Sequence, residues 1–151
     1  MTAEEKIIFM QAAITEAKKA QAKGEVPIGA VVVHQGKIVG RGHNLRETTN
    51  DSLTHAEVLA IQAANKALAS WRLEDCQLFV TLEPCPMCTG AILNSRLSEV
   101  YYGASDLKAG VCGTIMNLLD DPRLNHQAKV EKGTCQAECL ALLQNFFKQL
   151  R

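Results

Sequence analysis

The chain has 151 residues, of which 47% are hydrophobic and 21% are charged, and its 16 basic residues balance 16 acidic ones. This length and composition are typical of one ordinary globular domain with a sizeable core, so we expect a single domain over residues 1–151 and exclude disordered and fibrous proteins. The zero net charge gives no general basic excess for binding nucleic acid, although a local basic cluster would suffice.

The first residues of the chain favour a cytoplasmic protein. Residues 1–6 are polar and acidic, whereas a signal peptide starts basic and continues apolar. No run approaches the roughly 18 apolar residues that cross a membrane, so we expect no membrane partner. Thiols stay reduced in the cytoplasm, and the six cysteines therefore favour metal binding or catalysis over disulfides.

The first half of the chain predicts a helix, a hairpin and a second helix. Thr2 and Glu5 form a capping-box pattern, and apolar residues recur at helical spacing up to Gly24. Gln35 and Gly36 make a two-residue turn between two strand-like runs, since glycine tolerates positive φ. The expected elements are a helix over 2–24, strands over 28–33 and 37–42, and a helix over 54–68.

The second half of the chain predicts a strand, helix, strand unit followed by further elements. Pro86 suits the first position of the helix in this unit. Such a unit joins two parallel strands by a right-handed crossover, so the hairpin and the unit together predict a mixed sheet. The expected elements are a strand over 77–82, a helix over 86–95, a strand over 99–103, a loop over 104–113, a short helix over 114–119, a weak strand over 128–131 and a helix over 136–150.

Two short motifs carry the chemistry: His55-Ala56-Glu57 at the start of one helix, and Cys85 with Cys88 at the start of the next. Two cysteines at this spacing can face one point, and the positive end of the helix favours their thiolates. With His55 they supply three ligands, and a zinc site with three protein ligands usually keeps a fourth position for water. Glu57 can move protons beside that water. We therefore expect a catalytic zinc site.

Structural explanations compete with this interpretation. Glu57 and Thr54 also fit a capping box, in which the glutamate only binds the N-cap amide. Cys85 and Cys88 could hold a structural zinc closed by a further cysteine or by His126, or they could form a redox dithiol. The other four cysteines have no partner motif, and buried apolar thiols are expected at Cys76, Cys112, Cys135 and Cys139.

The motifs H-x-E and P-C-x-x-C, at residues 55–57 and 84–88, resemble those of the zinc-dependent deaminases that act on nucleotides. Over nearly its whole length the chain resembles, more narrowly, the bacterial tRNA adenosine deaminases of the TadA type. Cytidine, cytosine and guanine deaminases share the zinc motifs, so the narrower resemblance depends on other segments, which are residues 24–30, 43–44, 70–73 and 116–119.

This resemblance implies a cytidine-deaminase-like fold of the α/β class, with three α/β/α layers around a central mixed five-stranded sheet. It implies one zinc ion per subunit, held by His55, Cys85 and Cys88, and it implies Glu57 as the catalytic proton shuttle. Water would attack C6 of the adenine, and Glu57 would protonate the ring nitrogen and the departing ammonia, which gives inosine.

The same resemblance implies contacts to the base and to the RNA. The Asn44 side chain and the Ala56 backbone would bind the flipped base, although asparagine also favours turns. The resemblance also places further residues at the pocket wall or near the RNA, which are Val26, Pro27, Arg46, Asp106, Lys108, Asn125 and His126. Without the resemblance, these would be interpreted as ordinary exposed loop residues or as residues at the start of a strand.

The end of the chain places two aromatic residues beside two cations, which suits stacking of unpaired bases and binding of phosphate. The four residues are Phe146, Phe147, Lys148 and Arg151. Helical spacing predicts a buried stripe on the last helix and places Phe147 on that face, so Phe146 is expected to be the more exposed of the two. The expected stripe consists of Leu140, Leu143 and Leu150.

We therefore expect hydrolytic deamination of the wobble adenosine in a tRNA anticodon stem-loop by a homodimer, where the dimer rests on the resemblance alone. A loop suits this chemistry because unstacked bases cost least to flip. Two alternatives stay open. One is a deaminase of a free nucleobase or nucleoside, such as cytosine or guanine, which the neutral net charge supports. The other is a non-catalytic domain with a closed structural zinc.

Overall fold

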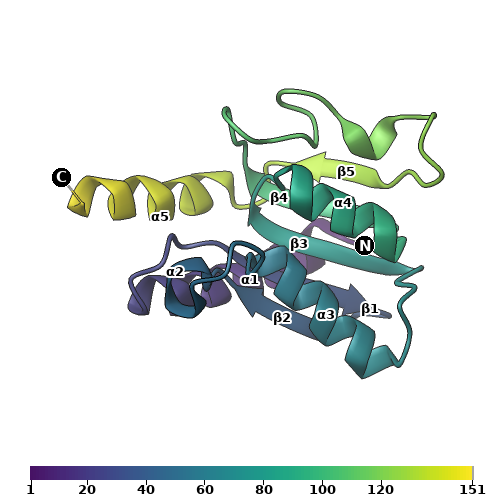
Figure 1. The fold of residues 1–151 in the computed structure, drawn as a ribbon, viewed down its shortest axis with the longest axis horizontal. Coiled ribbons are helices and arrows are strands. Elements are labelled where there is room, and N and C mark those ends of the chain that lie inside the picture. Colours follow the sequence, from purple (N-terminus) through teal and green to yellow (C-terminus); the bar gives the residue numbers. More distant parts are fainter. Residues whose placement is uncertain (151) are drawn as a thin grey trace.

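The computed structural model describes residues 1–150, which form an α/β fold (Figure 1). None of the helices within these residues is long and apolar enough to span a bilayer. Most of the predicted elements are confirmed to within two residues at each end. In chain order the elements are α1 (Ala3–Ala22), β1 (Gly29–His34), β2 (Lys37–His43), α2 (Arg46–Thr49), α3 (Ala56–Leu68), β3 (Cys76–Leu82), α4 (Pro86–Ser95), β4 (Glu99–Ala104), η1 (Leu118–Asp120), β5 (Lys129–Lys132) and α5 (Gln136–Gln149).

The five strands form one mixed sheet in the order β2-β1-β3-β4-β5. Strand β1 pairs antiparallel with β2 and β3, whereas β4 pairs parallel with β3 and β5. The hairpin turn has positive φ at both Gln35 (50°) and Gly36 (75°), as the favoured two-residue hairpin loop requires. The predicted hairpin, the parallel unit around α4 and the mixed sheet are therefore confirmed.

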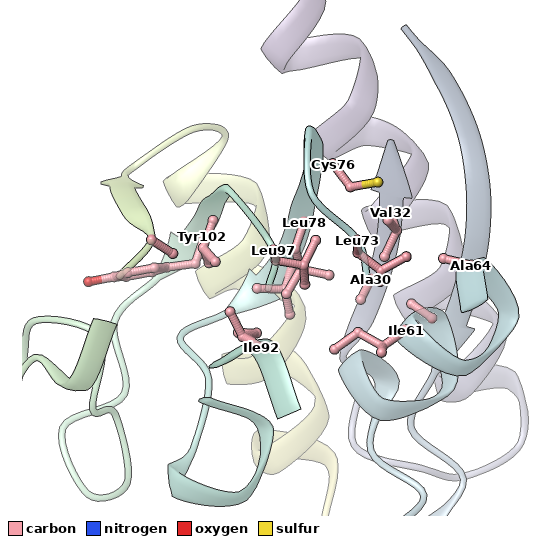
Figure 2. Close-up of a cluster of buried hydrophobic side chains, with 14 of the residues drawn as sticks. Ala30, Val32, Ile61, Ala64, Leu73, Cys76, Leu78, Ile92, Leu97 and Tyr102 are labelled. Atoms are coloured by element: carbon pink, nitrogen blue, oxygen red, sulfur yellow. The ribbon is translucent and has the colours of Figure 1, made fainter. Parts of the chain in front are cut away.

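Helices cover both faces of the sheet. Because strand residues alternate between the two faces, Val32 joins a core with α3 and α4, while its neighbour Val31 joins another with α1 and α5. Figure 2 shows the first of these cores, in which Ile61 of α3, Ile92 of α4 and Leu78 of β3 belong to one buried cluster. This is the three-layer α/β/α architecture that the resemblance implies.

Helix α3 lies very close to β2 at Gly42. A methyl group added to Gly42 would stand 2.4 Å from the carbonyl oxygen of Ala56 and 2.7 Å from the backbone nitrogen of Ala60. Because these neighbours are backbone atoms, they can yield only if the helix itself shifts. Gly42 therefore fixes the distance between the sheet and the start of α3, where His55 and Glu57 are located.

We expect Gly42→Ala to lower the free energy of unfolding by at least about 2 kcal/mol, because overpacking against rigid neighbours costs about 1–3 kcal/mol and sometimes more. The matched control is Gly90→Ala. Gly90 lies inside α4 with nothing within 4 Å of an added methyl group, so alanine should raise stability by about 0.5–1 kcal/mol. Denaturant unfolding of both variants measures the difference, and equal stabilities would contradict the close approach.

The prediction of a short helix over residues 114–119 is wrong. The chain instead forms a β-bridge between Cys112 and Asn117, followed by the single 3-10 turn η1. Gly113 has a φ of 135°, and its N–H donates to the carbonyl oxygen of Met116 (2.9 Å), so the backbone turns back before a helix can start. The Asn117 side chain then caps the 3-10 turn.

The buried stripe predicted for the last helix is also wrong. Within α5 only Cys139 is buried, whereas Leu140 is 39% exposed and Leu143 is half-buried; Leu150, which follows the helix, is 69% exposed. In Figure 1 the first turns of α5 lie beside the sheet and the rest of the helix extends beyond it. The apolar side chains of its outer turns therefore pack against little of the chain over residues 1–150.

Candidate active site

A cavity of about 230 Å³ lies where the starts of α3 and α4 meet the end of β3. Its walls come from segments that are far apart in the sequence, and they include most of the residues predicted for the zinc site and the base pocket. The lining residues are Val26, Ile28, Asn44, Arg46, His55, Ala56, Glu57, Leu82, Glu83, Cys85, Asp106 and Ala109.

Two helix starts position the predicted metal ligands. His55 is the N-cap of α3 and Cys85 is the N-cap of α4, both in an extended conformation, and neither side chain makes a capping hydrogen bond. Pro86 occupies the first turn of α4, where its fixed φ favours the start of a helix. Cys88 follows three residues after Cys85, so its side chain returns to the same side of the helix.

The side chains of His55, Cys85 and Cys88 form a cluster that could hold a metal ion. The Nδ1 atom of His55 lies 3.7 Å from the Sγ of Cys85 and 3.5 Å from the Sγ of Cys88, and all three ligand atoms lie within 4.8 Å of one another. Tetrahedral zinc at about 2.3 Å from sulfur and about 2.0 Å from nitrogen requires ligand atoms about 3.5–3.8 Å apart. The donor set and its spacing therefore fit zinc.

A fourth protein ligand is not part of this cluster in the chain over residues 1–150. His126 donates from Nε2 to the carbonyl oxygen of Leu97 (2.7 Å). The Cys112 thiol is hydrogen-bonded to the Thr89 hydroxyl (3.3 Å). Since these candidates for closing the site are engaged elsewhere, the arrangement favours a catalytic metal site over a structural one.

Hydrogen bonding within the cluster separates the pKa values of the two thiols. The Cys88 thiol, and then the His55 ring, stabilise the Cys85 thiolate and lower its pKa to about 4, although burial opposes this. The pKa of Cys88 is raised, because the thiol donates to Cys85 and is buried. The Cys85 thiolate also raises the pKa of His55. A divalent ion would displace the bound protons and take both sulfurs as thiolates.

Glu57 lies in the wall of the cavity and is only 4% exposed. The structure contradicts the capping-box explanation, because the N-cap is His55 and the Thr54 hydroxyl pairs with that of Thr49 (2.8 Å). Burial, and to a lesser degree the Cys85 thiolate, raises the pKa of the Glu57 carboxyl to about 7. A carboxyl with a pKa near neutrality can both accept and release a proton, as acid–base catalysis requires.

Asn44 combines the two roles that the sequence left open. Its side chain accepts from the Arg46 N–H (3.1 Å), which is a turn contact, and donates to the Val26 carbonyl oxygen (3.3 Å). It is 6% exposed and lines the cavity. An asparagine amide has two N–H donors and two lone pairs, so one of each is free to bind a ligand.

The other predicted contacts divide into two groups. Val26, Arg46, Ala56 and Asp106 line the cavity. The residues of the second group do not line it, and they are Pro27, Lys108, Asn125, His126, Phe146, Phe147 and Lys148. Arg151 lies outside the described residues.

The predicted order of exposure of the two phenylalanines is wrong. Phe147 is 47% exposed, whereas Phe146 is half-buried. Their rings meet edge to face, with centroids 5.3 Å apart and planes at 82°. Since α5 extends beyond the sheet, helical spacing alone does not determine which of its faces meets the rest of the chain.

Sequence reasoning missed part of the cavity wall. Ile28, Leu82 and Ala109 line it but carry no polar group, and nothing in their spacing marks them. Glu83 is a buried acidic residue at the end of a strand. Its only sequence signal is its position directly before Pro84 and Cys85.

Comparison with known proteins places this architecture in a family. The family model of the MafB19-like deaminases matches residues 4–151. A tRNA-specific adenosine deaminase of Bacillus subtilis (strain 168) is 56% identical over 151 residues, which are 100% of this chain and 92% of the relative.

Solved structures agree with this match. A structure from work on A-to-I editing by tRNA:A34 deaminases at the wobble position of transfer RNA has a TM-score of 0.86 and 39% identity, and covers 89% of this chain and 98% of its own. A guanine deaminase of Bacillus subtilis is less similar, with a TM-score of 0.65 and 34% identity over 98% of this chain and 95% of its own. The chain therefore belongs to the MafB19-like deaminase family and groups with its tRNA-specific adenosine deaminases.

Proposed function

We propose that this chain hydrolytically deaminates adenosine to inosine at the wobble position of a tRNA anticodon loop. The observation that carries the reaction class is the buried carboxyl of Glu57 in the same cavity as His55 and Cys85 of the ligand cluster. The relatives named tRNA-specific adenosine deaminases and the tRNA:A34 deaminase structure support the substrate.

The proposed cofactor is one Zn²⁺ per subunit, held by His55, Cys85 and Cys88. A zinc ion at such a site supplies Lewis-acid chemistry and a water with a pKa of about 7. His55 and Cys85 line the cavity, whereas Cys88 is fully buried. A substrate in the cavity therefore meets the ligand cluster from the side of His55 and Cys85.

Glu57 moves the protons in the proposed reaction. Its carboxyl accepts one proton of the attacking water and delivers it to the ring nitrogen of adenine. It then carries the second proton, from the new hydroxyl on C6, to the amino group, which leaves as ammonia. The free N–H and lone pair of Asn44, with the backbone of Ala56, orient the base edge. Burial of these polar groups favours the base that pairs with all of them, because an unpaired partner costs most where water is excluded.

The proposed RNA contacts surround the cavity and continue along the last helix. Arg46, which is exposed, and Asp106 belong to its wall. The exposed ring of Phe147 and the exposed amine of Lys148 suit an unstacked base and a phosphate. The remaining proposed contacts are Val26, Pro27, Lys108, Asn125, His126, Phe146 and Arg151.

The proposed assembly is a homodimer. Its proposed location is the cytoplasm, because the tRNA substrate is found there. Support for the dimer comes from large apolar side chains that are exposed in the described chain, among them Ile8 (63% exposed) and Leu140 (39%). Exposed apolar side chains gain free energy when a partner covers them. Sedimentation analysis of the purified protein decides between one subunit and two.

The proposed substrate is tested by offering the purified protein an anticodon stem-loop and, separately, free nucleobases and nucleosides. We expect inosine at the wobble position, with kcat/KM at least roughly 10²-fold above that for any free base, because polar contacts discriminate strongly between substrates. Mass analysis of the RNA and ammonia release measure both reactions. Turnover of free cytosine or guanine with none on the stem-loop would instead establish the free-base alternative, which the guanine deaminase relative represents.

A further inference from the structure

We propose that Glu83 is a positioning residue that holds the loop over residues 105–114 against the cavity and thereby sets the affinity for the nucleotide substrate. The inference rests on the proposed function for the identity of that substrate. Glu83 is 2% exposed and lines the cavity. It follows β3 and directly precedes the segment that ends in Cys85.

The Glu83 carboxylate accepts four hydrogen bonds, and all four come from this one loop. Its Oε1 accepts from the Asp106 N–H (3.0 Å) and from the Thr114 hydroxyl. Its Oε2 accepts from the N–H groups of Cys112 (3.0 Å) and Thr114 (3.1 Å). The donors come from both ends of the loop, so a single side chain ties the two ends together.

A side chain that only accepts hydrogen bonds suits this position, and a carboxylate is such a side chain. It offers about four lone-pair sites and carries no proton of its own, which matches four donors. A glutamine would place an NH₂ group against N–H groups that need an acceptor, and buried donors without an acceptor are costly. Because all four sites of Glu83 are used, the carboxylate has none left for a substrate and acts on it only through the loop.

The middle of the loop packs directly on the same side chain. A methyl group added to Gly110 would stand 2.3 Å from the Cδ atom of Glu83 and 2.6 Å from the carbonyl oxygen of Asp106. The next residue, Val111, donates its N–H to the carbonyl oxygen of Pro84 (3.2 Å). The loop is therefore seated on the chain segment between β3 and Cys85, with no room for a side chain at Gly110.

Two residues of the loop carry this constraint to the cavity. Asp106 and Ala109 both line it. The Asp106 carboxylate accepts from the N–H groups of Lys108 (3.0 Å) and Ala109 (3.1 Å), which folds the tip of the loop, while Glu83 holds the Asp106 backbone. A loop ordered in advance removes the cost of ordering it when the substrate binds.

Glu83→Gln tests this inference in the zinc-loaded enzyme with the anticodon stem-loop as substrate. We expect KM to rise by about 10²-fold, because a loop that is no longer held in advance must be ordered when the substrate binds. We expect kcat to change by less than about threefold, because the loop contributes no reacting group. Zinc content should stay at that of the unsubstituted chain. Glu99→Gln, a change in β4 away from the cavity lining, is the matched control and should leave KM unchanged.

Gly110→Ala provides a second variant that leaves the carboxylate intact but pushes a methyl group against it. It should raise KM in the same way, and it decides the question if Glu83→Gln does not fold. An unchanged KM in both variants, or a fall in kcat at unchanged KM, would overturn the inference. If the unsubstituted chain turns over a free base and not the stem-loop, the proposed function fails. The KM of both variants for that free base, compared with the KM of the unsubstituted chain, then tests the proposed role of Glu83.

Discussion

Replacing Glu57 by alanine is expected to leave zinc bound and to lower the rate of inosine formation by at least about 10³-fold. This loss lies within the rate enhancement that general acid–base catalysis contributes. Zinc should stay because Glu57 is not one of the three clustered ligands. Turnover should be lost because the two other carboxyls in the cavity wall are placed differently: Glu83 is fully hydrogen-bonded to its loop, and Asp106 is only partly buried, with its Oδ1 accepting from two N–H groups of the loop tip. Metal analysis and mass analysis of inosine measure the two quantities on the same sample.

Two control variants separate proton transfer from other effects of Glu57→Ala. Glu57→Gln keeps the size and much of the polarity of the side chain but cannot carry the proton, so it should be as inactive as the alanine variant. Glu74→Ala removes a glutamate that is 59% exposed and paired with Arg72, and it should be fully active. Substantial turnover by Glu57→Gln, with zinc still bound, would remove Glu57 from the proposed proton transfers.

The features that the sequence predicts well are those decided within a few residues. The hairpin turn follows from Gln35 and Gly36, and the start of α4 follows from Pro86. The ligand cluster follows in the same way, because the i, i+3 spacing of Cys85 and Cys88 places both sulfurs on one side of a helix start. His55 comes from a distant segment, and its place in the His55-Ala56-Glu57 motif at the start of another predicted helix marks it as the third ligand.

The features that the sequence does not predict depend on contacts between distant segments. Glu83 acquires its role from donors 23 to 31 residues further along the chain. The helix expected over residues 114–119 is replaced by a β-bridge and a 3-10 turn. The Gly113 N–H donates to the carbonyl oxygen of Met116, and the Asn117 side chain accepts the N–H that starts the 3-10 turn, so these groups form no α-helical hydrogen bonds. For α5, helical spacing shows which residues share a face but not whether that face meets the sheet, and Leu140 is exposed as a result.

Removing zinc is expected to abolish activity, because the three-ligand cluster is the only feature of the proposed site that can supply an activated water at neutral pH. The cluster itself is tested by Cys88→Ser, which replaces a thiolate with a poor zinc ligand and should weaken zinc binding by more than about 10²-fold. Cys135→Ser is the matched control, since Cys135 lies at the start of α5 outside the cluster. That variant should keep both zinc and turnover.

The most direct measurement follows inosine formation in an anticodon stem-loop by one protein sample before chelation, after chelation and after zinc is returned. The account predicts full loss of activity when the metal is stripped and recovery in proportion to the zinc rebound, up to one ion per chain. The Cys88→Ser variant, stripped of metal and given the same concentration of zinc, should recover no activity. Undiminished inosine formation by protein shown to be free of metal would contradict the proposed catalytic site.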